Sequence, residues 1–346
     1  MLTDIFAERY RDVRLWETFG TNERRLLVQS FQILSQDLYP FYDQSGNASE
    51  SAKRDWKTLN LLLSRELGLA SLSPTHYPRQ VQYGNQRNTV WEAWGEMNVA
   101  KNYVLEDLSA YQDADLEIKN RLSLIELGLR QYLKTTVAYE GLQGAMTETV
   151  LSSLSRRSTA LDRVVGTQMR QKIDSASDEI NQRFRQAGAP LTFNNGNFQI
   201  VRDELTAQEV AQPFWQLLSD AAWSNVDVEM REAMDRRDSG INDAAFHAAK
   251  ALESAIKVIC HERQAVTGRE NGASNYIDNL VSEARGSWLE RWRGDALREI
   301  FRQVRNPLGH GAGADRPRVL TPHETDWAIG SCMVWIRFLI ERHKDI

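Results

Sequence analysis

Apolar side chains recur every three to four residues along most of this 346-residue chain, and this spacing restricts its fold more than any other feature. Such a repeat gathers the apolar residues on one face of an α-helix. Helices are predicted from about Asn22 to Leu38, from Trp56 to a stop at Gly68, and from Asn242 through Ile259. Helices with one apolar face bury that face against each other. The sequence therefore predicts a mainly α protein.

One segment carries a convincing β signal. The runs Leu191-Thr192-Phe193 and Phe198-Gln199-Ile200-Val201 flank Asn194-Asn195-Gly196-Asn197. Asparagine and glycine tolerate the positive φ angles of a tight hairpin turn. A small β-hairpin near residues 191–201 is therefore predicted. It should pack against helices, because an isolated hairpin is only marginally stable.

Two other segments are harder to assign. Residues 71–88 contain Pro74, Pro78 and Gly84 and are expected to hold no long element, with helix resuming from Val90 to Tyr103. The many tryptophans and tyrosines of the first third are assigned to packing rather than to base stacking. The polar segment 147–186 either packs along one narrow stripe or reaches away from the body toward a partner.

The length suggests two domains. We expect an N-terminal helical domain at residues 1–205, which includes the hairpin, and a C-terminal helical bundle at residues 206–346. The net charge of −5 gives no global basic field, so any nucleic-acid site must be local. Between residues 285 and 318, eight arginines stand against four acidic residues, although a solvated helix face is the simpler explanation of such a run.

The two cysteines, Cys260 and Cys332, cannot build a disulfide framework, and neither lies in a zinc-binding pattern. Both lie in apolar helical patterns, where cysteine is usually a small core residue. No window reaches the ~20 apolar residues of a membrane helix, and the N-terminus lacks an apolar signal core. We therefore expect a cytoplasmic protein with no membrane contact, no metal and no cofactor.

The most informative segment for function is Val304-Arg305-Asn306-Pro307-Leu308-Gly309-His310-Gly311. Apolar residues at helical spacing precede it, so the segment closes a helix, and Pro307 pushes Asn306 out of the helical region. Arg298, Arg302 and Arg305 form a cationic stripe on that helix. A permanent cation at a helix end and a histidine on the following turn suit chemistry on a phosphodiester.

The arginine-to-histidine spacing is weak evidence by itself, because Arg318/His323, Arg316/His323 and Arg337/His343 also match it. His323 lies in the first turn of a helix capped by Thr321-Pro322-His323-Glu324, and the Arg337/His343 pair lies at the end of the last helix, where cations complement the helix dipole. His247 is interpreted as structural. Only Arg305/His310 combines a helix end, a turn and a cationic stripe.

Two regions of the sequence resemble a known family and support a functional role for the Arg305/His310 motif. Ala248-Ala249-Lys250-Ala251-Leu252-Glu253-Ser254-Ala255-Ile256-Lys257, followed by 304–311, resembles the C-terminal domain of abortive-infection proteins, a HEPN-type four-helix bundle. The N-terminal portion is similar to one group of AbiJ-like proteins. The matching features there are Phe6-Ala7-Glu8-Arg9-Tyr10, Trp16, Arg65-Glu66-Leu67-Gly68 and Asn181-Gln182-Arg183-Phe184.

This resemblance implies a metal-independent endoribonuclease of a phage-defence or toxin system. It implies a homodimer in which two Arg–His motifs form one composite site for RNA, and an N-terminal domain that senses a trigger or restrains the nuclease. Arg305 would bind the scissile phosphate, and His310 would transfer protons. Asn306 would orient the phosphate or His310. Arg298 and Arg302 would extend the contacts to RNA phosphates. The expected products are a 2′,3′-cyclic phosphate and a 5′-hydroxyl.

Glu253 matches the family's acidic position. It would pair with Arg305 or face the cleft, or it is an ordinary i,i+4 partner of Lys257 on a solvent-exposed helix face. Alternatives to the nuclease also remain open. One is a non-catalytic HEPN adaptor that dimerises and binds RNA or protein, and another is a helical scaffold. The sequence does not identify the RNA target, the trigger or any neutralising partner protein.

Overall fold

The computed structural model describes residues 4–42, 45–83, 86–149, 156–203, 206–218, 220–305 and 319–344. The chain divides into two compact units, Met1–Ile200 and Val201–Ile346. Within the described ranges, none of the helices has the length and apolar character needed to cross a bilayer. The mainly α fold predicted from the apolar spacing is confirmed, and the strands are confined to two antiparallel hairpins within these ranges.

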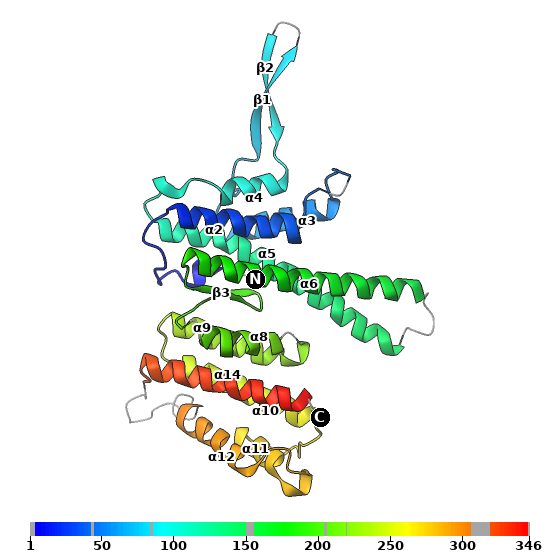
Figure 1. Ribbon diagram of the computed structural model, residues 1–346, viewed down its shortest axis with the longest axis vertical. Coiled ribbons are helices and arrows are strands. Elements are labelled where there is room, and N and C mark those ends of the chain that lie inside the picture. The colour runs from blue at the N-terminus through cyan, green and yellow to red at the C-terminus, as the bar shows by residue number, and fades with distance from the viewer. Residues whose placement is uncertain are drawn as a thin grey trace. The chain divides into compact units, whose positions relative to one another are not determined.

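The first unit is built around one long helix, α5 (Ala114–Thr149), which contacts most of the other elements of the unit (Figure 1). Its antiparallel neighbour α6 (Arg156–Ala187) buries a narrow stripe at Ile173, Ala176, Ile180 and Phe184, so the first alternative for segment 147–186 holds for this part. The remaining helical elements are α1 (Phe6–Arg9), α2 (Thr21–Gln32), the π-helical η1 (Ile33–Leu38), α3 (Glu50–Glu66), α4 (Glu96–Val104) and the 3-10 turn η2 (Leu108–Ala110).

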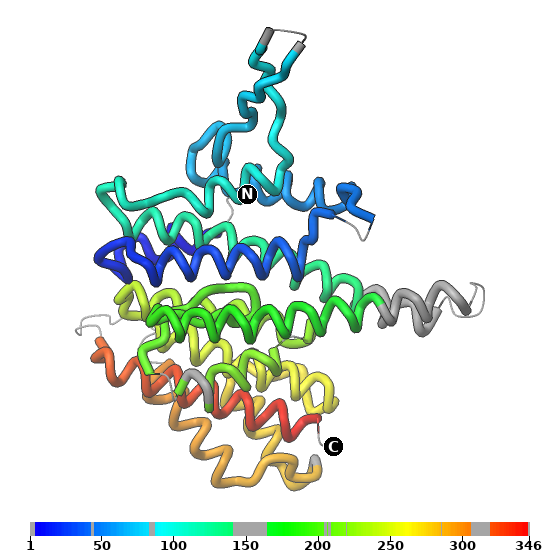
Figure 2. Tube along the Cα trace, turned by 45° about the horizontal axis from the view of Figure 1, so that its top comes forward, coloured from blue at the N-terminus to red at the C-terminus, as the bar shows by residue number. Residues whose placement is uncertain are grey.

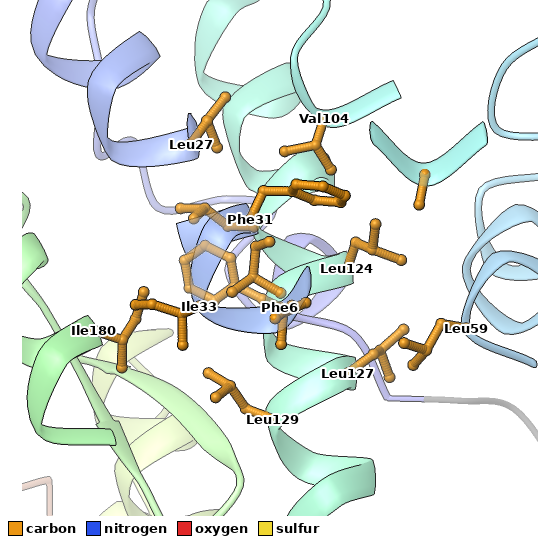
Figure 3. Close-up of a cluster of buried hydrophobic side chains, with 14 of the residues drawn as sticks. Phe6, Leu27, Phe31, Ile33, Leu59, Val104, Leu124, Leu127, Leu129 and Ile180 are labelled. Carbon is orange, nitrogen blue, oxygen red and sulfur yellow. The ribbon is translucent and has the colours of Figure 1, made fainter. Parts of the chain in front are cut away.

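Side chains from all these helices meet in one core. Figure 3 shows Phe6, Phe31, Leu124 and Ile180 converging from α1, α2, α5 and α6. The fully buried Trp56 indole donates a hydrogen bond to the Tyr39 carbonyl over 3.1 Å, so this aromatic residue serves packing, as predicted.

Buried charges tie the chain's N-terminal segment to α5. The Lys119 ammonium is buried and donates to the Tyr10 carbonyl over 2.8 Å and to the Asp115 carboxylate over 2.5 Å. Glu126, also buried, accepts hydrogen bonds from Arg9 and from the Phe198 backbone N–H. Buried charges are tolerated only when they are paired and hydrogen-bonded, and here every named charge is.

The predicted hairpin at 191–201 is confirmed. Strand β3 (Leu191–Asn194) pairs with β4 (Asn197–Ile200), and the turn residues Asn195 and Gly196 have φ angles of 42° and 96°. The ring of Phe198 lies 4.9 Å from that of Phe184 on α6, so the hairpin packs on the helices as expected.

A second hairpin was not predicted. Strands β1 (His76–Tyr83) and β2 (Gln86–Ala93) pair antiparallel, and the ribbon projects from the helices of its unit (Figures 1 and 2). The expectation of no long element in 71–88 is therefore wrong, as is the start of the next helix at Val90, because α4 begins at Glu96. Trp91 is 66% exposed, so packing does not explain this aromatic residue.

The second unit is centred on α10 (Ala244–Glu262), which packs against α9 (Ser224–Asp238), α14 (Pro322–Lys344), α11 (Ala273–Val281) and the π-helical η6 (Phe301–Arg305). The smaller elements are the π-helical η3 (Ala207–Ala211), α8 (Gln212–Leu217), the 3-10 turns η4 (Ala221–Trp223) and η5 (Glu283–Arg285), and α12 (Arg291–Ile300), which continues into η6.

Two sequence predictions for the second unit are confirmed. Thr321 and Glu324 form the capping box at the start of α14, since the Thr321 N–H donates to the Glu324 carboxylate over 2.8 Å and the Glu324 N–H donates to the Thr321 hydroxyl over 3.3 Å. Cys260 and Cys332 are both buried and form no disulfide, and burial raises the pKa of the Cys332 thiol to about 12.

Candidate functional site

Helix α10 brings a carboxylate into the middle of the second unit. Its alanines at 245, 248 and 249 are fully buried, and these short side chains let the neighbouring helices approach closely. Glu253 lies on the same helix with its side chain only 8% exposed. A carboxylate this deeply buried needs cationic or hydrogen-bonding partners, since removal from water disfavours its charge.

The segment α12–η6 positions the guanidinium of Arg305 near this carboxylate. Gly294 permits close approach to α11, because a Cβ at this position would lie 2.5 Å from Val281 Cγ2. Phe301 and Val304 are buried and anchor η6 against the bundle. π-helical turns are rare in proteins, and those that occur are often found at functional sites. This one ends on Arg305.

Glu253 receives a cation on each of its two oxygens. Arg305 Nε lies 2.8 Å from Oε2, and Lys257 Nζ lies 2.9 Å from Oε1. The exposed fractions are 30% for Arg305 and 43% for Lys257. Among the described residues, the buried Arg305 Nε meets no acceptor in hydrogen-bond geometry, so its contact with Glu253 is an ion pair without an aligned hydrogen bond.

Glu253 therefore forms both ion pairs considered from the sequence, but it is buried, so the alternative of a solvent-exposed helix face is wrong. The i,i+4 pair with Lys257 could be read from the spacing of the two residues on one helix. The pair with Arg305 joins two elements far apart in the sequence, so helical spacing gives no signal for it. The resulting group of Glu253, Lys257 and Arg305 carries a formal net charge of +1.

The two other arginines of the predicted stripe have acidic partners of their own. Arg298 pairs with Asp278 on α11 and with Asp295, the latter at 2.7 Å. Arg302 is 70% exposed and pairs with Glu299 at 2.7 Å. The hydrogen bond between them raises the pKa of Arg302 and lowers that of Glu299. Asp295 and Glu299 were already counted within 285–318, so the additional partners are Asp278 and Glu253, which reduce the local excess from four positive charges to two.

Asn306 and His310 lie outside the described residues, as do Arg316 and Arg318. Of the three predicted catalytic residues, the structure places Arg305 alone. Of the other predicted site residues it places Arg298, Arg302 and Glu253, and it brings Glu253 to Arg305.

The remaining histidines of the second unit that were weighed above have other surroundings. His247 lies 3.0 Å from Glu229 on α9, which agrees with a structural role. His343 pairs with Glu262 at 2.6 Å, and Arg337 pairs with Glu341. His323 is exposed in the first turn of α14. In the described ranges, no group of three or more His, Cys, Asp and Glu side chains is arranged to hold a metal ion.

Comparison with protein families identifies both halves of the chain. The model for AbiJ N-terminal domain 4 matches residues 4–216, and the model for a HEPN-like domain matches residues 224–343. Comparison with curated proteins gives no match, and comparison with solved structures gives none. The first family match covers more than half of the chain, and the second coincides with the helices that carry Glu253 and Arg305. The chain belongs to the AbiJ-like family of abortive-infection proteins and carries a HEPN-like domain in its C-terminal part.

Proposed function

We propose that this protein is a metal-independent endoribonuclease of the HEPN type that acts in phage defence by abortive infection or as a toxin. The observation that carries the proposal is the ion pair between Glu253 and Arg305. A nearly buried carboxylate fixes the guanidinium at the end of η6, one turn before the predicted Pro/Gly bend that bears His310. Arg305 remains 30% exposed in this pair, so its guanidinium can also reach an anion from solution.

The chemistry follows from the two residue types. A guanidinium has five N–H donors, and the Nε that faces Glu253 carries one of them. The others are suited to the non-bridging oxygens of a phosphodiester, where they stabilise the charge that develops during attack.

His310 would move the protons. The 2′-oxygen attacks phosphorus as its proton leaves, the bond from phosphorus to the 5′-oxygen breaks, and that oxygen receives a proton. Asn306 would orient the phosphate or the imidazole. The products are a 2′,3′-cyclic phosphate and a 5′-hydroxyl, and two protomers would contribute their Arg–His motifs to one composite site.

The test is cleavage of total RNA by the full-length protein in EDTA. Wild type should cut, and His310→Ala and Arg305→Ala should not. His323→Ala is the matched control, because this exposed histidine lies in the first turn of α14 and has no role in the proposed mechanism. If His310→Ala still cuts RNA, the mechanism is wrong. If wild type is inert but dimerises and binds RNA or a protein, the adaptor function replaces the nuclease.

We further propose that the N-terminal unit restrains the nuclease or senses a trigger. This rests on the family match to an AbiJ N-terminal domain and on the compactness of residues 1–200 as a separate unit. Removing residues 1–200 should change growth toxicity in cells. Equal toxicity of the full-length and shortened chains, at equal expression, would contradict this proposal.

A further inference from the structure

Lys257 shares with Arg305 the only carboxylate that either cation is paired with in the described part of the chain. We propose that Lys257 binds a second RNA phosphate, next to the scissile one, and so forms a substrate-binding subsite with Arg305. This inference rests on the proposed nuclease function. It adds a residue outside the predicted arginine stripe and outside the Arg–His motif.

Glu253 sets the distance between the two cations. Its Oε1 contacts Lys257 and its Oε2 contacts Arg305, so the ammonium and the guanidinium flank one carboxylate. One negative charge offsets only one of the two positive charges. The remaining positive charge sits at a partly exposed position, where an anion from solution can reach it.

Lys257 is held more firmly than an isolated surface lysine. Its Nζ lies 5.9 Å from the ring centroid of Tyr276 on α11, within the range of a cation–π contact. The carboxylate on α10 and the ring on α11 therefore position the ammonium from two helices. An ammonium has three N–H donors, and the contact with Glu253 engages one of them, so donors remain for phosphate oxygens.

The partner class follows from this geometry. Adjacent phosphates of a nucleic-acid strand present single negative charges at regular spacing, and two neighbouring cations match two such charges. A lysine acts at a phosphate as a point charge and an arginine as a planar fork, so Arg305 suits the reacting phosphate and Lys257 its neighbour.

The same helix supplies a closely matched control. Lys250 pairs with Glu229 at 2.7 Å, is 36% exposed, and lies 5.8 Å from the ring centroid of Phe246. Like Lys257, it is paired with one carboxylate and lies near one aromatic ring. The differences are that Glu229 lies on α9, that Phe246 lies on α10 itself, and that Glu229 is shared with His247 and not with Arg305.

The experiment compares Lys257→Met with Lys250→Met in full-length protein that also carries His310→Ala, so that bound RNA is not cut. Binding of a single-stranded RNA is measured over a range of salt concentrations. Lys257→Met should weaken binding about tenfold, the effect of losing one charged hydrogen bond. It should also reduce the slope of log affinity against log salt by about 0.7, the effect of one lost phosphate contact. Lys250→Met should change neither quantity, and Lys257→Arg should restore both.

Measurements of KM and kcat show whether Lys257 binds the substrate or only supports its neighbours. With His310 intact, Lys257→Met should raise KM and leave kcat nearly unchanged. A loss of kcat alone would mean that Lys257 only supports Glu253 and Arg305, and equal binding by the two methionine variants would also overturn the subsite. If wild type cleaves RNA while Lys257→Met behaves as wild type, the subsite fails and the nuclease stands. If wild type neither binds nor cleaves RNA, both proposals fail.

Discussion

Arg305 Nε lies 2.8 Å from Glu253 Oε2, and this contact joins the π-helical end of the arginine-striped segment to the small-residue helix α10. The two residues come from segments separated by α11 and α12. Their meeting depends on the alanines that keep α10 narrow, on Gly294, which lets α12 approach α11, and on Phe301 and Val304, which anchor η6. The position of the guanidinium is thus a property of the whole bundle.

Glu253→Gln tests whether this pair positions Arg305. The amide keeps the shape of the side chain but removes the charge that holds both cations. We expect RNA to bind at least as tightly, because the local net charge becomes more positive, while kcat falls about tenfold to a hundredfold, because the guanidinium is no longer fixed. Steady-state cleavage measures kcat, and RNA binding by Glu253→Gln in protein that also carries His310→Ala measures the affinity. An unchanged kcat would show that Glu253 does not position Arg305.

Arg302→Ala should affect mainly RNA binding, whereas Arg305→Ala should affect mainly kcat. Arg302 is largely exposed and pairs with Glu299, so its loss should weaken RNA binding modestly and leave kcat nearly unchanged. Loss of Arg305 should lower kcat about a hundredfold or more, the usual effect of removing one donor to a developing anion. The comparison uses kcat and KM on one RNA. Equal defects would mean that the stripe acts as a general phosphate contact without a special role for Arg305.

Glu270 should make folding of the second unit sensitive to acid. Hydrogen bonds from the Thr267 hydroxyl and backbone N–H, with a further one from the Asn279 side chain, lower the pKa of Glu270 from 4.5 to about 2. Because the folded-state pKa is the lower one, the stabilisation is fully present above about pH 4.5 and is lost as the pH falls toward 2. An NMR titration of the carboxyl should give this pKa, and Glu270→Gln should remove its share of the acid dependence. A titration midpoint near 4.5 would contradict the assigned hydrogen bonds.

Glu126→Ala should destabilise the first unit by about 3–5 kcal/mol, because it leaves buried arginines without their carboxylate. Glu126 has no exposed surface and binds Arg9, Arg130 and the Phe198 N–H. Glu8→Ala is the control, since Glu8 pairs with Arg11 at the surface and its loss should cost below about 1 kcal/mol. Denaturant unfolding of the full-length variants, followed by tryptophan fluorescence, measures the difference. Equal shifts for the two variants would refute the buried network.

Sequence prediction succeeded where the signal was local. The hairpin at 191–201 follows from two turn residues with positive φ, Asn195 and Gly196, and the capping box from the spacing of Thr321 and Glu324. The apolar repeat of α10 likewise depends only on neighbouring positions along one helix. Each of these structures forms from residues close in the sequence, so the residue order carries the information.

The β1–β2 ribbon was missed because both of its faces are largely exposed. Without a buried face there is no alternation of apolar and polar residues, and Trp91, Trp94 and Met97 imitate helical spacing. Pro78 also argued against a strand, but each strand of a two-stranded ribbon is an edge strand, where proline is tolerated.

The pairing of Asp278 with Arg298 was not predicted, for a different reason. Asp278 lies on α11, so this contact depends on how helices pack and not on spacing along one helix. The pairing of Glu253 with Arg305 also joins two separate elements, and it was among the expected roles of Glu253 only because of the family resemblance. A count of charges over 285–318 therefore overstated the positive field available to RNA.

The most direct test of the nuclease is the chemistry of the RNA ends it leaves. Full-length protein is incubated with a defined RNA in EDTA, and the ends are identified by mass spectrometry, with a second RNA that carries a single 2′-deoxy substitution at the cut site. We expect a 2′,3′-cyclic phosphate and a 5′-hydroxyl from the first RNA, no cut at the substituted position in the second, and no products from His310→Ala or Arg305→Ala. Products with a 3′-hydroxyl and a 5′-phosphate, or continued cleavage by either variant, would contradict it.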